Sequence, residues 1–402
     1  MKVKSIETFP VALELKRPFK IANAFFTHMY YVITKIETDE GVSGYGESVP
    51  AWEVTGETQF SVMDCIHHLT EENKIGFTLI GQEVSTLEDV MAIMEILCAR
   101  NHPNIFWGAP AAKAGVEEAL LDIVGKAQGK AIYELFGGKP RPVRFGHVLG
   151  IAPVQETLRQ AKGLLERGVD KIKAKIGVER IDGHENYQRD VEIVLGIRDL
   201  IAKIRPEARL VADANQGFVT AARTIEFLEK VPSCLEYLEQ PVLAGDRLGL
   251  KRIKESCDIA LMADESLHTY QDAELLLELG AVDVFNIKLM KCGGVIEGLR
   301  LAGLAKKHHK RVVLGSMLEN QLGAVPSLHT FFCDDVIENT ESGFFTWLKD
   351  NIGSGLELNG DLIDVPSGPG VGLQIDEGDF HKLRLHPRHS KTLERVLTLY
   401  QS

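Results

Sequence analysis

The sequence predicts an α/β protein in which a TIM-type barrel of seven or eight β/α units carries an α+β capping domain. The first observation behind this is a series of short apolar runs that alternate with helix-length patterns over most of the chain. The second is that three of these runs end in Asp213, Glu239 and Asp264, and Lys288 ends a fourth, at nearly constant intervals. Each interval has the length of one strand, one helix and two short connections. The four charged side chains are therefore expected at the C-terminal rim of one barrel, where active sites form.

Residues 1–127 are predicted to form the capping domain. Apolar residues alternate as in strands over residues 2–15 and 30–38, and a turn leads from there to a third strand over residues 43–47. Residues 19–29 are expected to form the loop between the first two strands. Helical spacing of apolar residues follows in three stretches, residues 58–70, 87–99 and 111–127. Strands followed by helices are typical of an α+β unit.

Two loops of this domain carry more aromatic residues than a connection needs, with Phe26 in the first and Trp52 in the second. Two interpretations remain open: the rings pack against a neighbouring domain, or they cover a substrate pocket. Because of the second interpretation, Phe26 and Trp52 are candidate substrate-binding residues.

Residues 128–345 are predicted to form the barrel, and residues 346–402 a C-terminal segment that returns to the cap. Most strand-like runs of the barrel region are followed by a helical pattern, such as residues 153–167 and 188–204. The runs cover residues 143–149, 171–176, 210–213, 235–239, 260–264, 282–288, 311–315 and 335–339. Eight such units are what a β/α barrel requires.

Lysines occupy expected interior positions of two of these strands. Residues two apart in a strand share a face, so Lys173 and Lys175 point the same way, and Lys288 lies on a later strand. Lysines are seldom buried without a partner or a function. Lys291 is assigned no chemistry, because it can equally face solvent or contact the backbone.

The overall composition limits the class of protein. A net charge of -12 without a run of basic residues argues against nucleic acid as a partner. No apolar run reaches membrane-spanning length and the chain opens into a strand-like segment, so neither a membrane span nor a signal peptide is expected. The six cysteines form no Cys-x-x-Cys pair, which fits reduced thiols. A cytoplasmic protein is expected.

The three acids form a candidate metal site. A lone Asp at a strand end is usually a helix cap or an ion-pair partner, but capping does not explain three acids at successive strand ends. Carboxylates with open positions beside them are how Mg²⁺ is usually held, and no His or Cys accompanies them to suggest zinc. Asn215, two residues past Asp213, is a further candidate for binding substrate. A lysine near such an ion has a positive neighbour, which lowers its pKa toward that of a general base.

Several motifs occur in a fixed order along the chain. GYGES and VTGET lie in the predicted cap, and ALLDIVGK covers residues 119–126. KIKAKIG, DANQG, EQP, ADES, NIKLMKCGG and GSMLEN follow in the predicted barrel. With these motifs the chain resembles the muconate lactonizing enzyme subgroup of the enolase superfamily over nearly its whole length. VTGET, WGAPAAKAG and NIKLMKCGG are most similar to racemases of N-succinylated amino acids.

The resemblance implies a role for each charged residue of the barrel motifs. The implied Mg²⁺ ligands are Asp213, Glu239 and Asp264. Lys175 and Lys288 would be the acid/base pair on opposite faces of the substrate, and Lys173 would assist near the substrate carboxylate. Even-numbered homo-oligomers are common in the superfamily, so a homo-oligomer is expected.

Further residues are implied on the substrate side of the site. Glu265 matches a supporting position beside the last metal ligand, and Glu319 a substrate-proximal position after the seventh strand. Dipeptide epimerases that resemble this chain carry Asp-x-Asp at the end of the eighth strand, whereas this chain has Asn339-Thr340-Glu341-Ser342. The device that binds the dipeptide ammonium group is therefore missing or replaced by Glu341.

The expected function is a Mg²⁺-dependent racemase or epimerase that moves a proton at the carbon next to a carboxylate, through a metal-stabilised enediolate. The expected substrate is an N-acyl amino acid, with an N-succinyl group preferred. Dipeptide epimerisation, o-succinylbenzoate synthesis and muconate cycloisomerisation remain alternatives on the same scaffold. A non-catalytic binding module is the alternative from another class, but a pure binder has no need for bases on both faces of its ligand.

Overall fold

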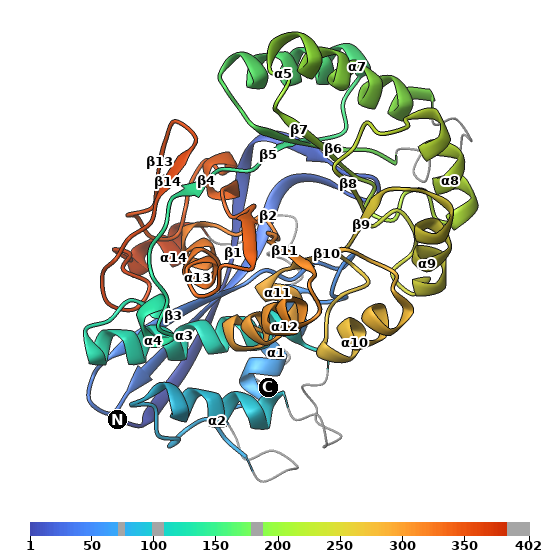
Figure 1. The fold of residues 1–402 in the computed structure, drawn as a ribbon. Helices are drawn as coiled ribbons and strands as arrows, with labels where there is room; N and C mark the ends of the chain where they lie inside the picture. The colour runs from blue at the N-terminus through green and yellow to red at the C-terminus, as the bar shows by residue number, and fades with distance from the viewer. Residues whose placement is uncertain (71–76, 99–107, 178–187, 384–402) are drawn as a thin grey trace.

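The computed structural model describes residues 1–70, 77–98, 108–177 and 188–383 (Figure 1). These residues form an antiparallel sheet with helices, a parallel sheet of eight strands and a small third sheet. The predicted fold class, an α/β barrel with an α+β capping domain, is confirmed. No helix within the described ranges has both the length and the apolar character needed to cross a membrane.

The cap begins with a three-stranded antiparallel sheet of long strands. In order, these are β1 (Val3–Lys20), β2 (Phe25–Thr38) and β3 (Ser43–Ser48). The loop expected over residues 19–29 is wrong, because Phe19 pairs with Phe26 and Lys20 with Phe25 in the β1–β2 ladder. An irregularity in the register between Glu14 and Phe19 breaks the alternation of side chains there, which hides the strand in the sequence.

Helix α3 (Pro110–Gln128) packs directly on β3, because the glycines of β3 have no side chain where the two elements meet. A Cβ atom added at Gly46 of β3 would lie 2.0 Å from the carbonyl oxygen of Gly115 in α3. Gly44 approaches α3 in the same way, since a Cβ there would lie 2.1 Å from the carbonyl oxygen of Ala119. Two shorter helices, α1 (Gln59–His67) and α2 (Leu87–Leu97), complete the expected set.

The barrel sheet is parallel and runs in chain order from β5 to β12. Its strands are β5 (His147–Leu149), β6 (Lys171–Lys175), β7 (Arg209–Asp213), β8 (Tyr237–Glu239), β9 (Ala260–Ala263), β10 (Val284–Ile287), β11 (Arg311–Leu314) and β12 (Ile337–Thr340). Gly146 brings the two terminal strands together, since a Cβ there would lie 3.3 Å from the carbonyl oxygen of Thr340. The sheet thus curls until its ends meet, and the interior becomes a closed core.

Helices cover the outside of this sheet (Figure 1). They are α5 (Val154–Glu166), α7 (Gln188–Ile204), α8 (Ala221–Lys230), α9 (Arg247–Ser256), α10 (Tyr270–Leu279), α12 (Val295–Lys307) and α13 (Gln321–Phe331). The short helix α11 (Leu289–Cys292) follows β10 and packs on α3 of the cap. A short 3₁₀ helix, Phe344–Trp347, follows β12. The single strand expected over residues 143–149 is wrong: its first part, β4 (Val143–Arg144), pairs with β14 (Leu362–Asp364) in the third sheet.

Residues 371–383 of the C-terminal segment lie against the cap, whereas β14 of the same segment pairs with β4. The backbone N–H of Val371 donates to Asp122 Oδ1 of α3 at 2.9 Å. The hydroxyl of Tyr45 on β3 donates to Glu377 Oε1 at 2.5 Å, and the N–H of Ala12 on β1 donates to the carbonyl of Leu383 at 3.0 Å. The segment therefore covers the cap sheet along several elements.

Replacing Gly46 with alanine tests the close contact between β3 and α3. The new methyl group has backbone on its far side and no flexible side chain to displace, so we expect a loss of about 3 kcal/mol of stability. Gly303→Ala is the matched control, because Gly303 lies exposed in α12 with nothing near its Cβ position, and alanine there should stabilise by about 1 kcal/mol. Denaturant unfolding measures the free energy of unfolding of both variants. Equal changes in the two variants would contradict the close contact between β3 and α3.

Candidate active site

The barrel interior changes from apolar to charged toward the C-terminal ends of the strands. Val211, Tyr237 and Met262 belong to the apolar core inside the barrel. Side chains two residues apart in a strand share a face, so the next interior position after each of them is two residues later, and in all three cases it is an acid. These acids are Asp213, Glu239 and Asp264, all fully buried. The regular spacing along the sequence thus becomes one layer of charge at one end of the barrel.

The three carboxylates face one another. Each offers an oxygen atom, and these atoms lie within 4.8 Å of one another. Asp213, Glu239 and Asp264 are the one such group of metal-ligating side chains found in the described part of the chain. A donor set made only of carboxylate oxygens suits a hard divalent cation such as Mg²⁺.

Two lysines of β6 lie against this layer. The Nζ atom of Lys173 lies 2.7 Å from Glu239 Oε2 and 3.2 Å from Asp213 Oδ2. Lys175 donates to Asp213 Oδ2 at 2.5 Å and to Asn215 Oδ1 at 2.9 Å. The alternation along β6 therefore delivers both lysines to the acids, as expected from the sequence.

Lys288 reaches the acids from the other side of the barrel. It follows β10, and its Nζ donates to Asp264 Oδ2 at 2.7 Å. In the sheet, β7, β8 and β9 separate β10 from β6, so half of the barrel circumference lies between Lys288 and Lys175. The acids occupy the strands between the two lysines.

Lys291 also belongs to the charged layer, which the sequence analysis missed. Its side chain is buried, so the expectation that it can face solvent is wrong. The Nζ donates to Asp264 Oδ1 at 2.5 Å, to the Asp264 carbonyl at 2.6 Å and to the Asn286 carbonyl at 3.0 Å. Each oxygen of the Asp264 carboxylate thus has its own lysine. The only signal in the sequence is the position of Lys291 one helical turn beyond Lys288.

The acids of the layer titrate differently. Burial, followed by the charge of Asp213, raises the pKa of Glu239 well above its usual value. Burial also acts to raise the pKa of Asp213, but the charges of Lys175 and Lys173 outweigh it and lower this pKa to about 2. The lysines therefore compensate part of the acid charge, and Glu239 is the acid with the least compensation.

The protein groups around Lys288 raise its pKa. Burial acts to lower its pKa, but the charges of Asp264 and Glu239 outweigh burial and raise it. The lowered lysine pKa expected beside a bound ion depends on the positive charge of that ion and stays a prediction. Among the protein groups themselves, the carboxylates dominate.

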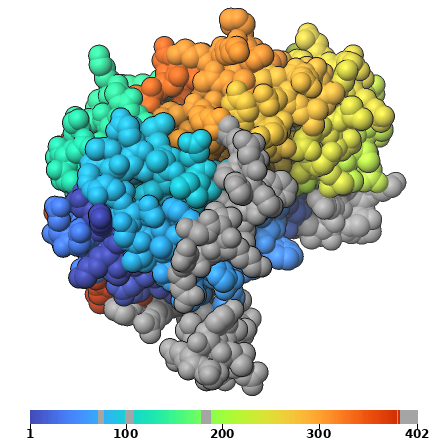
Figure 2. Space-filling model, turned by 90° about the horizontal axis from the view of Figure 1, so that it is seen from below, coloured from blue at the N-terminus to red at the C-terminus, as the bar shows by residue number. Residues whose placement is uncertain are grey.

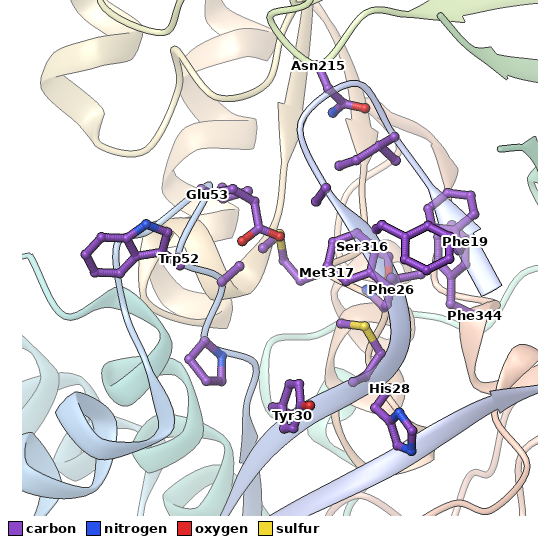
Figure 3. Close-up of a pocket in the computed structure, with 18 of the residues that line it drawn as sticks. Phe19, Phe26, His28, Tyr30, Trp52, Glu53, Asn215, Ser316, Met317 and Phe344 are labelled. Atoms are coloured by element: carbon purple, nitrogen blue, oxygen red, sulfur yellow. Dashed lines mark hydrogen bonds between the residues drawn. The ribbon is translucent and has the colours of Figure 1, made fainter. Parts of the chain in front are cut away.

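A cavity of about 540 Å³ opens above this layer, between the cap and the barrel (Figure 3). Lys175, Lys288 and Asn215 line its barrel side, and Phe26 and Trp52 line its cap side. In Figure 3 the ring of Trp52 lies at the edge of the cavity, and this side chain is 74% exposed. The barrel bases and the aromatic cap loops thus enclose the same space.

Two predicted substrate-side residues do not line the cavity. Glu319 accepts hydrogen bonds from the Ser316 hydroxyl and from the N–H of Met317 at 2.9 Å, behind the cavity wall. Glu265 accepts from Asn215 Nδ2 at 3.3 Å and is buried. In the structure both support residues that line the cavity, so a direct substrate contact of either residue stays a prediction.

Glu341 lines the cavity but is already paired. Its two carboxylate oxygens accept hydrogen bonds from Lys173 Nζ at 2.9 and 3.1 Å. The end of the eighth strand is therefore connected to the second strand across the barrel interior. A cationic substrate group at Glu341 would have to compete with Lys173.

The fold and the site together define an enzyme built as a capped β/α barrel. Residues 4–137 match the mandelate racemase / muconate lactonizing enzyme N-terminal domain, and residues 156–379 match the enolase C-terminal domain-like family. The chain belongs to this family of the enolase superfamily, in the subgroup of muconate lactonizing enzymes, and it is an isomerase of that superfamily.

Individual relatives are similar over almost the full chain. The N-succinyl-L-Arg/Lys racemase of Bacillus cereus is 31% identical over 95% of this chain and 98% of its own length. The crystal structure of that racemase superposes with a TM-score of 0.86 at 30% identity, covering 96% of this chain and 99% of the other. A dipeptide epimerase from Cytophaga hutchinsonii, complexed with Mg and the dipeptide D-Ala-L-Val, gives 0.84 at 26% identity, with 96% and 99% coverage.

Lys291→Met tests whether Lys291 compensates the buried charge of Asp264. Breaking a buried ion pair from one side leaves an uncompensated charge, so we expect a loss of about 3 to 5 kcal/mol in the free energy of unfolding. Lys307→Met, at an exposed position of α12, should change stability by less than about 0.5 kcal/mol. Urea unfolding compares the two variants. A Lys291→Met protein as stable as the control would contradict the role.

Proposed function

We propose that this protein is a Mg²⁺-dependent racemase or epimerase that transfers the proton at the carbon next to a carboxylate, on an N-acyl and preferably N-succinyl amino acid. The observation that carries the proposal is the placement of Lys175 and Lys288 on strands half a barrel apart, both lining one cavity above three buried acids. A two-base proton transfer needs this arrangement, because one base must act on each face of the substrate.

Asp213, Glu239 and Asp264 would hold the magnesium ion. Their donor set fits the ion, since all three ligands are hard oxygens, and the raised pKa of Glu239 marks a place where further positive charge is favourable. When bound, Mg²⁺ would supply positive charge at the substrate carboxylate, where negative charge develops as the α-proton leaves.

The lysines would perform the proton transfer. One of Lys175 and Lys288 removes the α-proton from its face, and the other protonates the opposite face, with the roles exchanged for the other enantiomer. Lys173, held between Glu239 and Glu341, would keep a positive charge near the substrate carboxylate.

The pairing of Glu341 supports an N-acyl substrate over a free dipeptide. Both oxygens of Glu341 are bound to Lys173, so an ammonium group would find no free carboxylate at the end of the eighth strand. The similarity to an N-succinyl-L-Arg/Lys racemase supports the same choice. Dipeptide epimerisation is the second candidate, because Glu341 does line the cavity and related dipeptide epimerases are known. A homo-oligomer and a cytoplasmic location complete the proposal.

Deuterium exchange in D₂O tests the reaction and the bases. With wild-type enzyme, we expect both enantiomers of an N-succinyl amino acid to exchange the α-hydrogen and to racemise. Lys288→Ala should lose racemisation by a factor of about 10³ or more and retain exchange for one enantiomer only, because one base remains. Lys175→Ala should retain exchange for the opposite enantiomer. NMR follows both processes, and the same panel includes dipeptides. Unchanged racemisation in either variant would exclude that lysine as a base.

Glu239→Gln tests the metal site without relying on activity. Replacing a carboxylate ligand by an amide should weaken Mg²⁺ binding by about tenfold or more, as measured by calorimetry. Glu229→Gln is the matched control, since Glu229 is an exposed residue of α8 and does not belong to the group of three buried acids. Equal Mg²⁺ affinity in the two variants would rule out Glu239 as a ligand.

A further inference from the structure

One wall of the cavity is a turn of the barrel whose residues belong to the GSMLEN motif. Ser316, Met317 and Leu318, between β11 and α13, line the cavity opposite the aromatic cap loops. Figure 3 shows Ser316 and Met317 near the centre of the view, close to Phe26. Met317 and Leu318 are both largely buried and contribute apolar surface to the cavity.

The backbone of this turn adopts a conformation that is unfavourable for a residue with a Cβ atom. Leu318 has a φ of 66°, in the left-handed region. Such residues persist only where their surroundings determine the conformation, and they are frequent at ligand sites. Within the turn, the Leu318 N–H donates to Ser316 Oγ at 3.0 Å and the Met317 N–H donates to Glu319 Oε1 at 2.9 Å.

The cap supplies the remaining contacts. The hydroxyl of Tyr31 on β2 donates to the carbonyl of Leu318 at 2.7 Å, and both residues are buried. Glu47 of β3 accepts hydrogen bonds from the N–H groups of Asn320 and Gly323, both at 3.1 Å. Three hydrogen bonds between cap strands and the barrel therefore hold the turn and the first residues of α13.

We infer that Tyr31 is a positioning residue for substrate selection: its hydroxyl keeps Leu318 in the left-handed conformation, so that Met317 and Leu318 form an apolar wall against the substrate side chain. This inference rests on the proposed function, and it assigns a part in selecting the substrate side chain to a residue that does not itself line the cavity. Without the hydrogen bond to its carbonyl, Leu318 loses a contact that offsets its unfavourable φ.

Tyr31→Phe removes the hydroxyl and keeps the buried ring. We expect amide hydrogen exchange of Leu318, Glu319 and Asn320 to accelerate by about fivefold or more, since a typical hydrogen bond is lost. Tyr133→Phe is the control, because Tyr133 is also buried and its hydroxyl donates no hydrogen bond within the described part of the chain. Unchanged exchange of the turn in the Tyr31→Phe protein would overturn the inference.

Steady-state kinetics test the selectivity. For N-succinyl phenylalanine, Tyr31→Phe should raise KM about fivefold with kcat changed less than twofold, and for N-succinyl alanine both constants should stay the same. Met317→Ala, which removes part of the wall directly, should produce the same dependence on side-chain size with the hydrogen exchange of residues 318–320 little changed. A fall in kcat alone, or equal changes for both substrates, would overturn the inference.

The two proposals fail in different ways. If the wild-type protein exchanges the α-hydrogen of no N-succinyl amino acid or dipeptide in the panel, the proposed function is wrong, and amide exchange of the turn still decides whether Tyr31 positions it. If the wild type is active and Tyr31→Phe behaves as wild type, only the role of Tyr31 is wrong.

Discussion

Two buried glutamates of the cap accept hydrogen bonds from the N-terminal ends of two barrel helices, and the cavity depends on this docking. Glu117 of α3 accepts from the N–H of Ile296 in α12 at 3.0 Å, and Glu47 binds the start of α13. A helix N-terminus attracts a carboxylate through its free N–H groups and its dipole. At each of these two helix N-termini the barrel has a glycine. A Cβ atom at Gly294 would collide with the carboxylate of Glu117, and a Cβ atom at Gly323 would collide with that of Glu47. The docking thus needs a matched residue on each side.

The same docking brings the aromatic loops of the cap next to the charged layer of the barrel. The barrel contributes the acids and lysines, and the cap contributes the aromatic loops and the residues that hold the turn at Leu318. Neither part alone encloses the 540 Å³ cavity. The charged layer and the cap-held wall belong to different parts of the chain. Substitutions in the cap can therefore change which substrate side chain fits, while the acids and lysines of the barrel stay the same.

The charged layer is stable because its charges compensate one another at short range. Acids on three adjacent strands face lysines from β6 and from the end of β10, and every one of these side chains is largely buried. Burial of such groups is costly unless each has a close partner. Lys291 serves this purpose for Asp264, whereas Glu239 keeps a raised pKa. The protein therefore carries a local preference for added positive charge where its carboxylates converge.

The sequence by itself determined the barrel, the layer of acids and the lysines on β6, because strand ends and side-chain alternation follow from local spacing along the chain. Only the tertiary structure decided the contacts between distant segments: Lys291 on Asp264, Glu341 on Lys173, and Tyr31 on Leu318. The sequence pattern allowed Lys291 either solvent or a backbone contact, of which only the second occurs, and it predicted a loop over residues that β1 and β2 extend into. Local patterns carry no information on which residues meet across the interface between cap and barrel, and that interface shapes the cavity.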